Sequence, residues 1–449
     1  MRTPNPFATT TSCVSPRQAL QTALVRGALI GVCTGALIGL FRLSHERASK
    51  LVATFVPNWD AGGMVVTAQV GLWLCALIVL ARVLGTLVRS EPLTSGSGIP
   101  QTELTLAGKL PLPWLRIVLF KYAGSWLALV AGLSLGREGP SIQIGGALGR
   151  GLEEVWTSPQ EASALTHNPH IIAGAIAGLA SAFGAPLAGV LFAFEEMKCR
   201  LSVPLLLFAC ASALGAQGVT RFVLGLGDIL PFPVVTPPRW EDFWMLALFG
   251  VVLGWLGTLY NRVLLALKDM EARQTWFPDQ WRMLPPLLCA GLATLVVPRI
   301  LGGGEALILE LGSGGGFTLR ALVALLILKV LYSILSVTAR IPGGLLMPIL
   351  CVGALIGSLW AHTGLMVSSA HGDAGQVAAY ILFGMAGFFA GTVRAPLTGI
   401  ALVTEMSGAI NGLPGSLVVG VVACLTANFL HCPPVYDSLK ARIPPQARL

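Results

Sequence analysis

The chain has 449 residues, of which 54% are hydrophobic and 11% are charged. Ordinary soluble domains carry about 25% charged residues, so this composition excludes a protein whose surface mainly faces water. The formal net charge is +8, but the basic residues are scattered over short loops and tails. A protein that binds nucleic acid is therefore not expected.

Apolar segments recur along the whole chain, and many approach the length of about 20 residues that a membrane helix needs. The first half holds candidate segments near 27–43, 64–88, 115–135, 140–152, 171–195 and 203–225. A Pro-rich break at 229–241 follows, and the second half holds segments near 242–267, 283–301, 319–338, 343–361, 377–404 and 415–431. These segments predict an all-α polytopic membrane protein in a lipid bilayer.

We divide the chain into five parts on this basis. They are an N-terminal tail (1–26), a first membrane repeat (27–226), a linker (227–241), a second membrane repeat (242–431) and a C-terminal end (432–449). Basic residues exceed acidic ones in both end segments, so the positive-inside rule predicts that both termini are cytoplasmic.

The two halves contain matching phrases. APLAGVLFAFEEM at 185–197 resembles APLTGIALVTEM at 395–406, and each places a glutamate ten residues after its alanine, at Glu195 and Glu405. An internal duplication explains this match. Paired segments interrupted by Gly and Pro in two halves are typical of transporters, whose sites are built from half-helix ends that attract anions.

Three Gly/Pro phrases stand out, namely GSGIP at 96–100, GREGPSIQIG at 136–145 and PGGLLMP at 342–348. Each predicts a loop that opens a helix, with a proline in the first turn, where a missing N–H is harmless. Taken singly, each phrase is explained more simply as a kink or a tight helix contact.

Together, and followed by PPVY at 433–436, the three phrases resemble the CLC family of chloride channels and chloride/proton exchangers over residues 27–443. The resemblance implies two inverted repeats of broken, tilted helices, and a homodimer with one pathway in each subunit. The transported ions would be chloride and protons, with no cofactor, metal or catalytic residue. The absence of the regulatory modules common in eukaryotic relatives favours a bacterial inner membrane.

The resemblance also implies the ligands of the anion. They are the hydroxyls of Ser97 and Tyr436 and the backbone N–H groups of Leu345 and Leu346. The family commonly reads GGIFAP where this chain reads GGLLMP, a change that keeps the backbone donors and removes an aromatic side chain. A helix N-cap at Ser97 and an interfacial anchor at Tyr436 are the alternative interpretations.

Glu138 matches the gating glutamate of the family, with the backbone of Arg137 and Gly139 as anion donors near the gate. An acid within a membrane segment points to function, and an ion pair between Glu138 and Arg137 is the alternative. Glu196 matches the internal proton acceptor of the exchangers.

Other charged residues within the membrane segments have structural explanations. Glu195 and Glu405 are predicted to act as caps or in salt bridges. Lys121, Lys329 and Arg394 either raise the local positive potential or pair with these acids or with backbone carbonyls.

Three other functions remain as alternatives. A passive chloride channel would leave Glu196 structural, whereas selectivity for fluoride or nitrate is disfavoured by Ser97 and Tyr436. An intramembrane hydrolase would use a histidine base, with His45, His167, His170 and His431 as candidates. It is disfavoured because the SGSG phrase at 95–98 runs into Ile99 and Pro100, which suits a helix start better than a nucleophile elbow.

Overall fold

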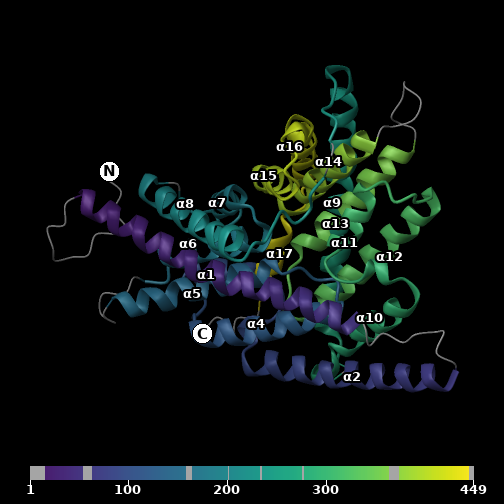
Figure 1. Ribbon diagram of the computed structural model, residues 1–449, viewed down its shortest axis with the longest axis horizontal. Coiled ribbons are helices and arrows are strands. Elements are labelled where there is room, and N and C mark those ends of the chain that lie inside the picture. Colours follow the sequence, from purple (N-terminus) through teal and green to yellow (C-terminus); the bar gives the residue numbers. More distant parts are fainter. Residues whose placement is uncertain are drawn as a thin grey trace.

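The computed structural model describes residues 16–53, 63–157, 164–200, 202–232, 235–275, 278–363 and 374–443. Most of the predicted N-terminal tail, two residues of the predicted linker and the last six residues of the chain lie outside these ranges. Every regular element within them is helical (Figure 1). Seven of the described helices are long and apolar enough to cross a membrane, and the prediction of an all-α polytopic membrane protein is confirmed.

The first half contains α1 (Pro16–Ala53), α2 (Gly63–Ser90), α3 (Ile99–Leu106), α4 (Trp114–Val130), α5 (Glu138–Trp156), α6 (Pro169–Phe183), α7 (Pro186–Glu195) and α8 (Val203–Gly218). The second half contains α9 (Phe243–Arg273), α10 (Leu284–Val296), α11 (Glu305–Gly312), α12 (Leu319–Thr338), α13 (Leu346–His362), α14 (Ala374–Val393), α15 (Pro396–Ser407), α16 (Leu413–Phe429) and α17 (Val435–Ala441). Within the described ranges there are also six short helical turns, at Pro92–Thr94, Val219–Val223, Trp240–Asp242, Asp279–Trp281, Pro298–Ile300 and Ile410–Gly412.

Two of the predicted segments each divide into two helices. The segment at 171–195 breaks where Gly184 takes a left-handed conformation (φ 66°) and Pro186 opens α7. The segment at 377–404 breaks in the same way at Arg394 (φ 73°), before Pro396 opens α15. A left-handed residue ends a helix, and a proline at the next first turn starts another.

Glycines in α1 bring it close to α8. A Cβ added at Gly31 would lie 2.1 Å from the Ser212 carbonyl oxygen, and one at Gly35 would lie 2.7 Å from that of Ala216. Small residues at four-residue spacing therefore let the two backbones touch, as is common between membrane helices.

The helices α3–α8 recur as α11–α16 in the same order, and corresponding pairs make the same contacts. Helix α5 packs on α6 as α13 packs on α14, and α1 packs on α8 as α9 packs on α16. In Figure 1, α1, α6 and α8 lie together at the left, and α9, α14 and α16 lie together at the upper right. The packing agrees with the duplication predicted from the matching phrases.

The repeats meet through reciprocal contacts of the kind that a two-fold axis generates. The Glu405 carboxylate accepts hydrogen bonds from the N–H groups of Leu187 (3.0 Å) and Ala188 (2.8 Å), in the first turn of α7. The Glu195 carboxylate accepts from Leu397 (3.1 Å) and Thr398 (2.7 Å), in the first turn of α15. Each glutamate therefore caps the helix that carries the other, and the prediction of structural caps is confirmed.

We expect Glu405→Ala to lower the apparent melting temperature of the detergent-solubilised protein, because two N–H groups at the start of α7 lose their acceptor. Losing a helix cap costs about 1–2 kcal/mol. Fluorescence-monitored thermal unfolding measures the effect, with Glu241→Ala at an exposed glutamate as the matched control. Equal melting temperatures for the two variants would contradict the capping role.

Candidate functional site

The loops that precede α3, α5 and α13 are joined by backbone hydrogen bonds. Gly136 and Gly344 form an antiparallel bridge, with N–H to carbonyl distances of 2.8 and 2.6 Å. The N–H of Gly96 donates to Arg340 (3.4 Å), and the N–H of Gly343 donates back to Gly96 (3.0 Å). The three Gly/Pro phrases, which are up to about 250 residues apart in the chain, therefore meet at one place.

Glycine is required where these loops touch. A Cβ added at Gly139 would lie 2.4 Å from the Ser97 hydroxyl oxygen, and one at Gly344 would lie 2.8 Å from a Glu138 carboxylate oxygen. The start of α5 consequently lies against Ser97, and the loop before α13 lies against Glu138.

Ser97 and Tyr436 present buried hydroxyl groups to this place. Ser97 is 9% exposed and Tyr436 is fully buried, and neither hydroxyl has a hydrogen-bond partner among the described residues. The two side chains are close to each other, and Glu138 and Glu196 are charged neighbours of Tyr436. Gly98, not Ser97, is the N-cap of α3, so the alternative interpretation of Ser97 as a helix cap is wrong. Full burial likewise excludes an interfacial anchor at Tyr436.

Glu138 is the first residue of α5 and is fully buried. Its carboxylate lies near the backbone nitrogen of Met347 in the first turn of α13, but neither oxygen meets the geometry of a hydrogen bond. A helix start favours negative charge. The carboxylate therefore occupies a position that a mobile anion would also favour.

Arg137, the N-cap of α5, directs its guanidinium away from Glu138. Its Nε donates to the Ala182 carbonyl (3.1 Å), and its Nη2 pairs with Glu305 (3.1 Å). The predicted alternative, an ion pair between Arg137 and Glu138, is not formed. Gly139 lies against Ser97, and Arg137 is buried beside Glu138.

The start of α13 supplies the other backbone donors. Leu345 is its N-cap and Leu346 its first residue, and both are buried. The first N–H groups of a helix have no intrahelical acceptor, so these two positions can donate to an anion without placing a full positive charge beside it.

Glu196 lies at the end of α7 and is 5% exposed. Its charged neighbours are Glu103, Asp437, Lys198 and Lys440. Lys440 pairs with Glu103 and with Asp437 (2.8 Å), and Lys198 also pairs with Asp437 (2.7 Å). These ion pairs connect α17, which carries Tyr436, to α3 and to the loop after α7.

The buried cations hold the loops in place. The Nζ of Lys121 donates to the carbonyls of Thr94 (2.9 Å) and Gly96 (2.6 Å). In the second repeat, Lys329 donates to Ile300 (2.9 Å) and Gly302 (2.7 Å). Pairing with backbone carbonyls, one of the two predicted explanations, is therefore confirmed for both lysines. Arg394 likewise donates to Asn428 and to the carbonyl of Cys432.

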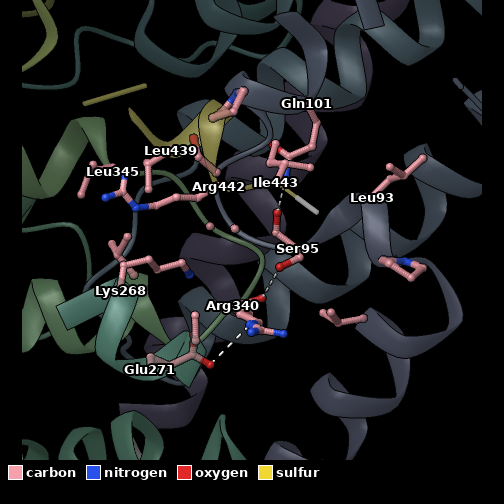
Figure 2. A pocket seen from close by; sticks show the side chains of 18 of the residues that line it. Leu93, Ser95, Gln101, Lys268, Glu271, Arg340, Leu345, Leu439, Arg442 and Ile443 are labelled. Atoms are coloured by element: carbon pink, nitrogen blue, oxygen red, sulfur yellow. Dashed lines mark hydrogen bonds and ion pairs between the residues drawn. The ribbon is translucent and has the colours of Figure 1, made fainter. Parts of the chain in front are cut away.

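A cavity of about 360 Å³ leads to Ser97 and is named the Ser97 cavity here (Figure 2). The loops before α3 and α13 form one wall, and Leu439 and Arg442 near the C-terminus form another. Its cations are partnered, because Arg340 pairs with Glu271 (3.3 Å) and Arg442 pairs with Asp269 (2.7 Å). The cavity reaches Ser97 and Leu345, two of the predicted anion ligands.

Sequence reasoning missed the residues that support the site. Glu103 is an acid inside the short helix that follows GSGIP, and that position could have been noticed. Its partner Lys440 is 337 residues away, and nothing in the sequence links the two. The pairing of Arg137 with Glu305 was missed for the same reason.

The histidines do not assemble a hydrolytic site. His170 lies 3.3 Å from Glu153 and packs edge-on against Phe208. His45 is half-buried and has Ser49 four residues along the same helix (3.4 Å), a pair that provides no nucleophile elbow. Among the described residues, no group of three or more His, Cys, Asp or Glu could hold a metal ion.

A polytopic helical protein in which helix starts and neutral hydroxyls converge on a buried acid belongs to the class of ion-transport proteins. Residues 75–428 match the voltage gated chloride channel family. The chain therefore belongs to this family, the CLC family, and is a transporter and not an enzyme.

Curated relatives and solved structures agree with this assignment. The chain is 31% identical to the H(+)/Cl(-) exchange transporter ClcA of Vibrio cholerae over 427 residues, covering 92% of this chain and 88% of that protein. It is 32% identical to ClcA of Cronobacter sakazakii over 430 residues (92% and 89%). A slow cyanobacterial Cl⁻/H⁺ antiporter superimposes with a TM-score of 0.85 at 28% identity, covering 96% of this chain and 98% of the antiporter. A CLC-type fluoride/proton antiporter shares the fold with a TM-score of 0.76 at 22% identity (95% and 99%).

We expect Tyr436→Leu to weaken chloride binding by about 10-fold or more, because a hydrogen bond to a charged group contributes roughly 1.5–3 kcal/mol. Isothermal titration of the solubilised protein with chloride measures this. The matched change Tyr380→Leu alters a buried tyrosine that packs on Phe249 and Phe383 and leaves the affinity unchanged. An unaltered affinity in Tyr436→Leu would remove this hydroxyl from the site.

Proposed function

We propose that this protein exchanges chloride for protons across the membrane, and that Glu138 is the gate. The observation that carries the proposal is the buried Glu138 carboxylate, which lies without a hydrogen-bond partner where the starts of α5 and α13 meet. Relatives of this chain are H(+)/Cl(-) exchange transporters at 31–32% identity over most of their length.

Chloride is held by neutral donors in this proposal. The hydroxyls of Ser97 and Tyr436 and the N–H groups of Leu345 and Leu346 converge without a full countercharge beside them. Binding of this kind is strong enough to draw chloride from water and weak enough to release it. Backbone donors at Arg137 and Gly139 serve the same role nearer the gate.

The gate works by competition. When Glu138 is ionised, its carboxylate occupies the helix starts that chloride needs. When it is protonated, that attraction is lost, the side chain moves away, and chloride takes its place. Each opening therefore requires a proton, which links the two fluxes.

Glu196 is the proposed proton acceptor on the cytoplasmic side. Its burial and its mixture of acidic and basic neighbours support this role, and it has no acidic counterpart in the second repeat. We further infer that the protein lies in a bacterial inner membrane with both termini cytoplasmic. We also infer that it forms a homodimer in which each subunit holds a complete pathway, because all proposed site residues belong to one chain.

Transport in sealed liposomes tests the exchange directly. We expect an imposed chloride gradient to drive protons uphill when the voltage is controlled with potassium and valinomycin, with external pH and chloride recorded together. Chloride movement without proton movement would instead identify a passive channel, in which Glu196 is structural.

Substitution of the gate separates the two ions. In Glu138→Gln, we expect chloride flux to persist and proton transport to fall below detection, because a neutral side chain neither competes with chloride nor carries a proton. The same liposome recordings measure both fluxes. Proton pumping at the wild-type ratio in this variant would remove Glu138 from the mechanism.

Two adjacent acids give a matched comparison for the inner proton site. We expect Glu196→Gln to stop proton movement and to leave chloride flux. Glu195→Gln should keep proton coupling, because Glu195 caps α15 and takes no part in proton transfer. Retained coupling in Glu196→Gln would exclude it as the proton acceptor.

A further inference from the structure

A second cavity, of about 160 Å³, lies next to Glu138 and is named the Arg137 cavity here. The loops before α5 and α11 line it, together with His45 of α1 and Glu305. Gly136 and Met347 also line it, and the Glu138 carboxylate lies close to both residues. The cavity is therefore separated from the gate by one layer of residues.

The repeat relates this cavity to the Ser97 cavity. The Ser97 cavity is lined by the loops before α3 and α13, whose counterparts in the other repeat are the loops before α11 and α5. Gly98 and Gly304 are the N-caps of α3 and α11, with φ of 99° and 104°. The two cavities are consequently the opposite mouths of one pathway.

The orientation proposed above assigns a side to each mouth. The Ser97 cavity includes Leu439 and Arg442, close to the cytoplasmic C-terminus. His45 lies in the last third of α1, a helix that begins near the cytoplasmic N-terminus. The Arg137 cavity therefore opens to the outer solution.

The repeat is broken at two positions in this outer mouth. Gly303 stands at the position that corresponds to Ser97, so the outer mouth lacks the serine hydroxyl. Glu305 stands at the position that corresponds to Ile99, so the outer mouth has a carboxylate where the inner mouth has an apolar side chain. Glu305 is the first residue of α11. It pairs with Arg137, whose side chain is 5% exposed, whereas that of Glu305 is 35% exposed.

The Glu305 carboxylate lies beside two buried guanidinium groups at the outer mouth. Arg42 and Arg137 donate to the carbonyls of Ser181 and Ala182 at the end of α6 (both 3.1 Å). The positive potential of these two guanidinium groups would draw anions toward the gate. Glu305 forms an ion pair with Arg137 (3.1 Å), and Glu305 and Glu46 are the acidic neighbours of Arg42.

We propose that Glu305 is a positioning residue that controls chloride entry from the outer side. Its carboxylate acts as a tethered anion that occupies the Arg137 guanidinium and the start of α11. Chloride arriving from outside must compete with it. The apparent affinity for outer chloride is thereby kept low, and the corresponding position of the inner mouth is the apolar Ile99. This inference rests on the proposed pathway through Glu138.

Vesicles of opposite orientation test the proposal. Radioactive chloride uptake is measured against chloride concentration in right-side-out and everted membrane vesicles from the same cells. In Glu305→Gln we expect the half-saturating chloride concentration to fall about 3- to 10-fold in right-side-out vesicles, since one unit of opposing charge is removed. It should change by less than about two-fold in everted vesicles, and the outer effect should shrink at high ionic strength.

Three further variants complete the design. Glu305→Asp keeps the charge and is expected to behave as the wild type. Glu310→Gln neutralises an acid in the same helix that pairs with exposed Arg299 (2.7 Å), away from the cavity, and should leave both sides unchanged. Glu305→Ala provides a second measurement if Glu305→Gln accumulates poorly.

An unchanged outer affinity, or an equal change on both sides, would overturn the role of Glu305. Glu138→Gln distinguishes this failure from a failure of the pathway. If Glu138→Gln uncouples chloride from protons while Glu305→Gln shows no sided effect, the gate stands and only this inference is lost.

Discussion

The structure depends on one constraint, which is that an anion must be held in a low-dielectric interior without a full positive charge. Helix starts meet this requirement because their free N–H groups carry partial charge. They can converge only if their loops approach at backbone distance. The bridge between Gly136 and Gly344 and the contact of Gly139 with Ser97 provide that approach. Buried lysines that donate to loop carbonyls then hold the loops in position.

The proposed functional residues lie where the duplication is imperfect. Glu138 at the start of α5 corresponds to Leu346 at the start of α13, and Glu196 corresponds to Met406. The positions that remain alike, such as Glu195 with Glu405 and Lys121 with Lys329, are structural. A symmetric framework thus carries an asymmetric set of acids and hydroxyls, which gives the pathway two different ends.

The sequence predicted most of the framework, because helix starts and repeated segments can be recognised from short stretches of sequence. Matching phrases revealed the duplication, and Gly/Pro phrases revealed the helix starts. The division of 171–195 was also readable, from Gly184 followed by Pro186. Contacts between distant residues could not be predicted from the sequence, since Lys440 meets Glu103 only after α17 has packed on α3. The charges that surround Glu196 and the gate were therefore invisible before the fold was known.

The exchange of caps between α7 and α15 bears on how the protein is made. The N–H group of Leu187 is bound by a carboxylate 218 residues further along the chain, which is synthesised on the order of tens of seconds later at ordinary rates of translation. In lipid an unsatisfied N–H group is costly, so the first repeat remains in the bilayer without its final geometry until its twin is inserted. Neither repeat then reaches its native structure alone during biosynthesis, and the two repeats complete their folding together.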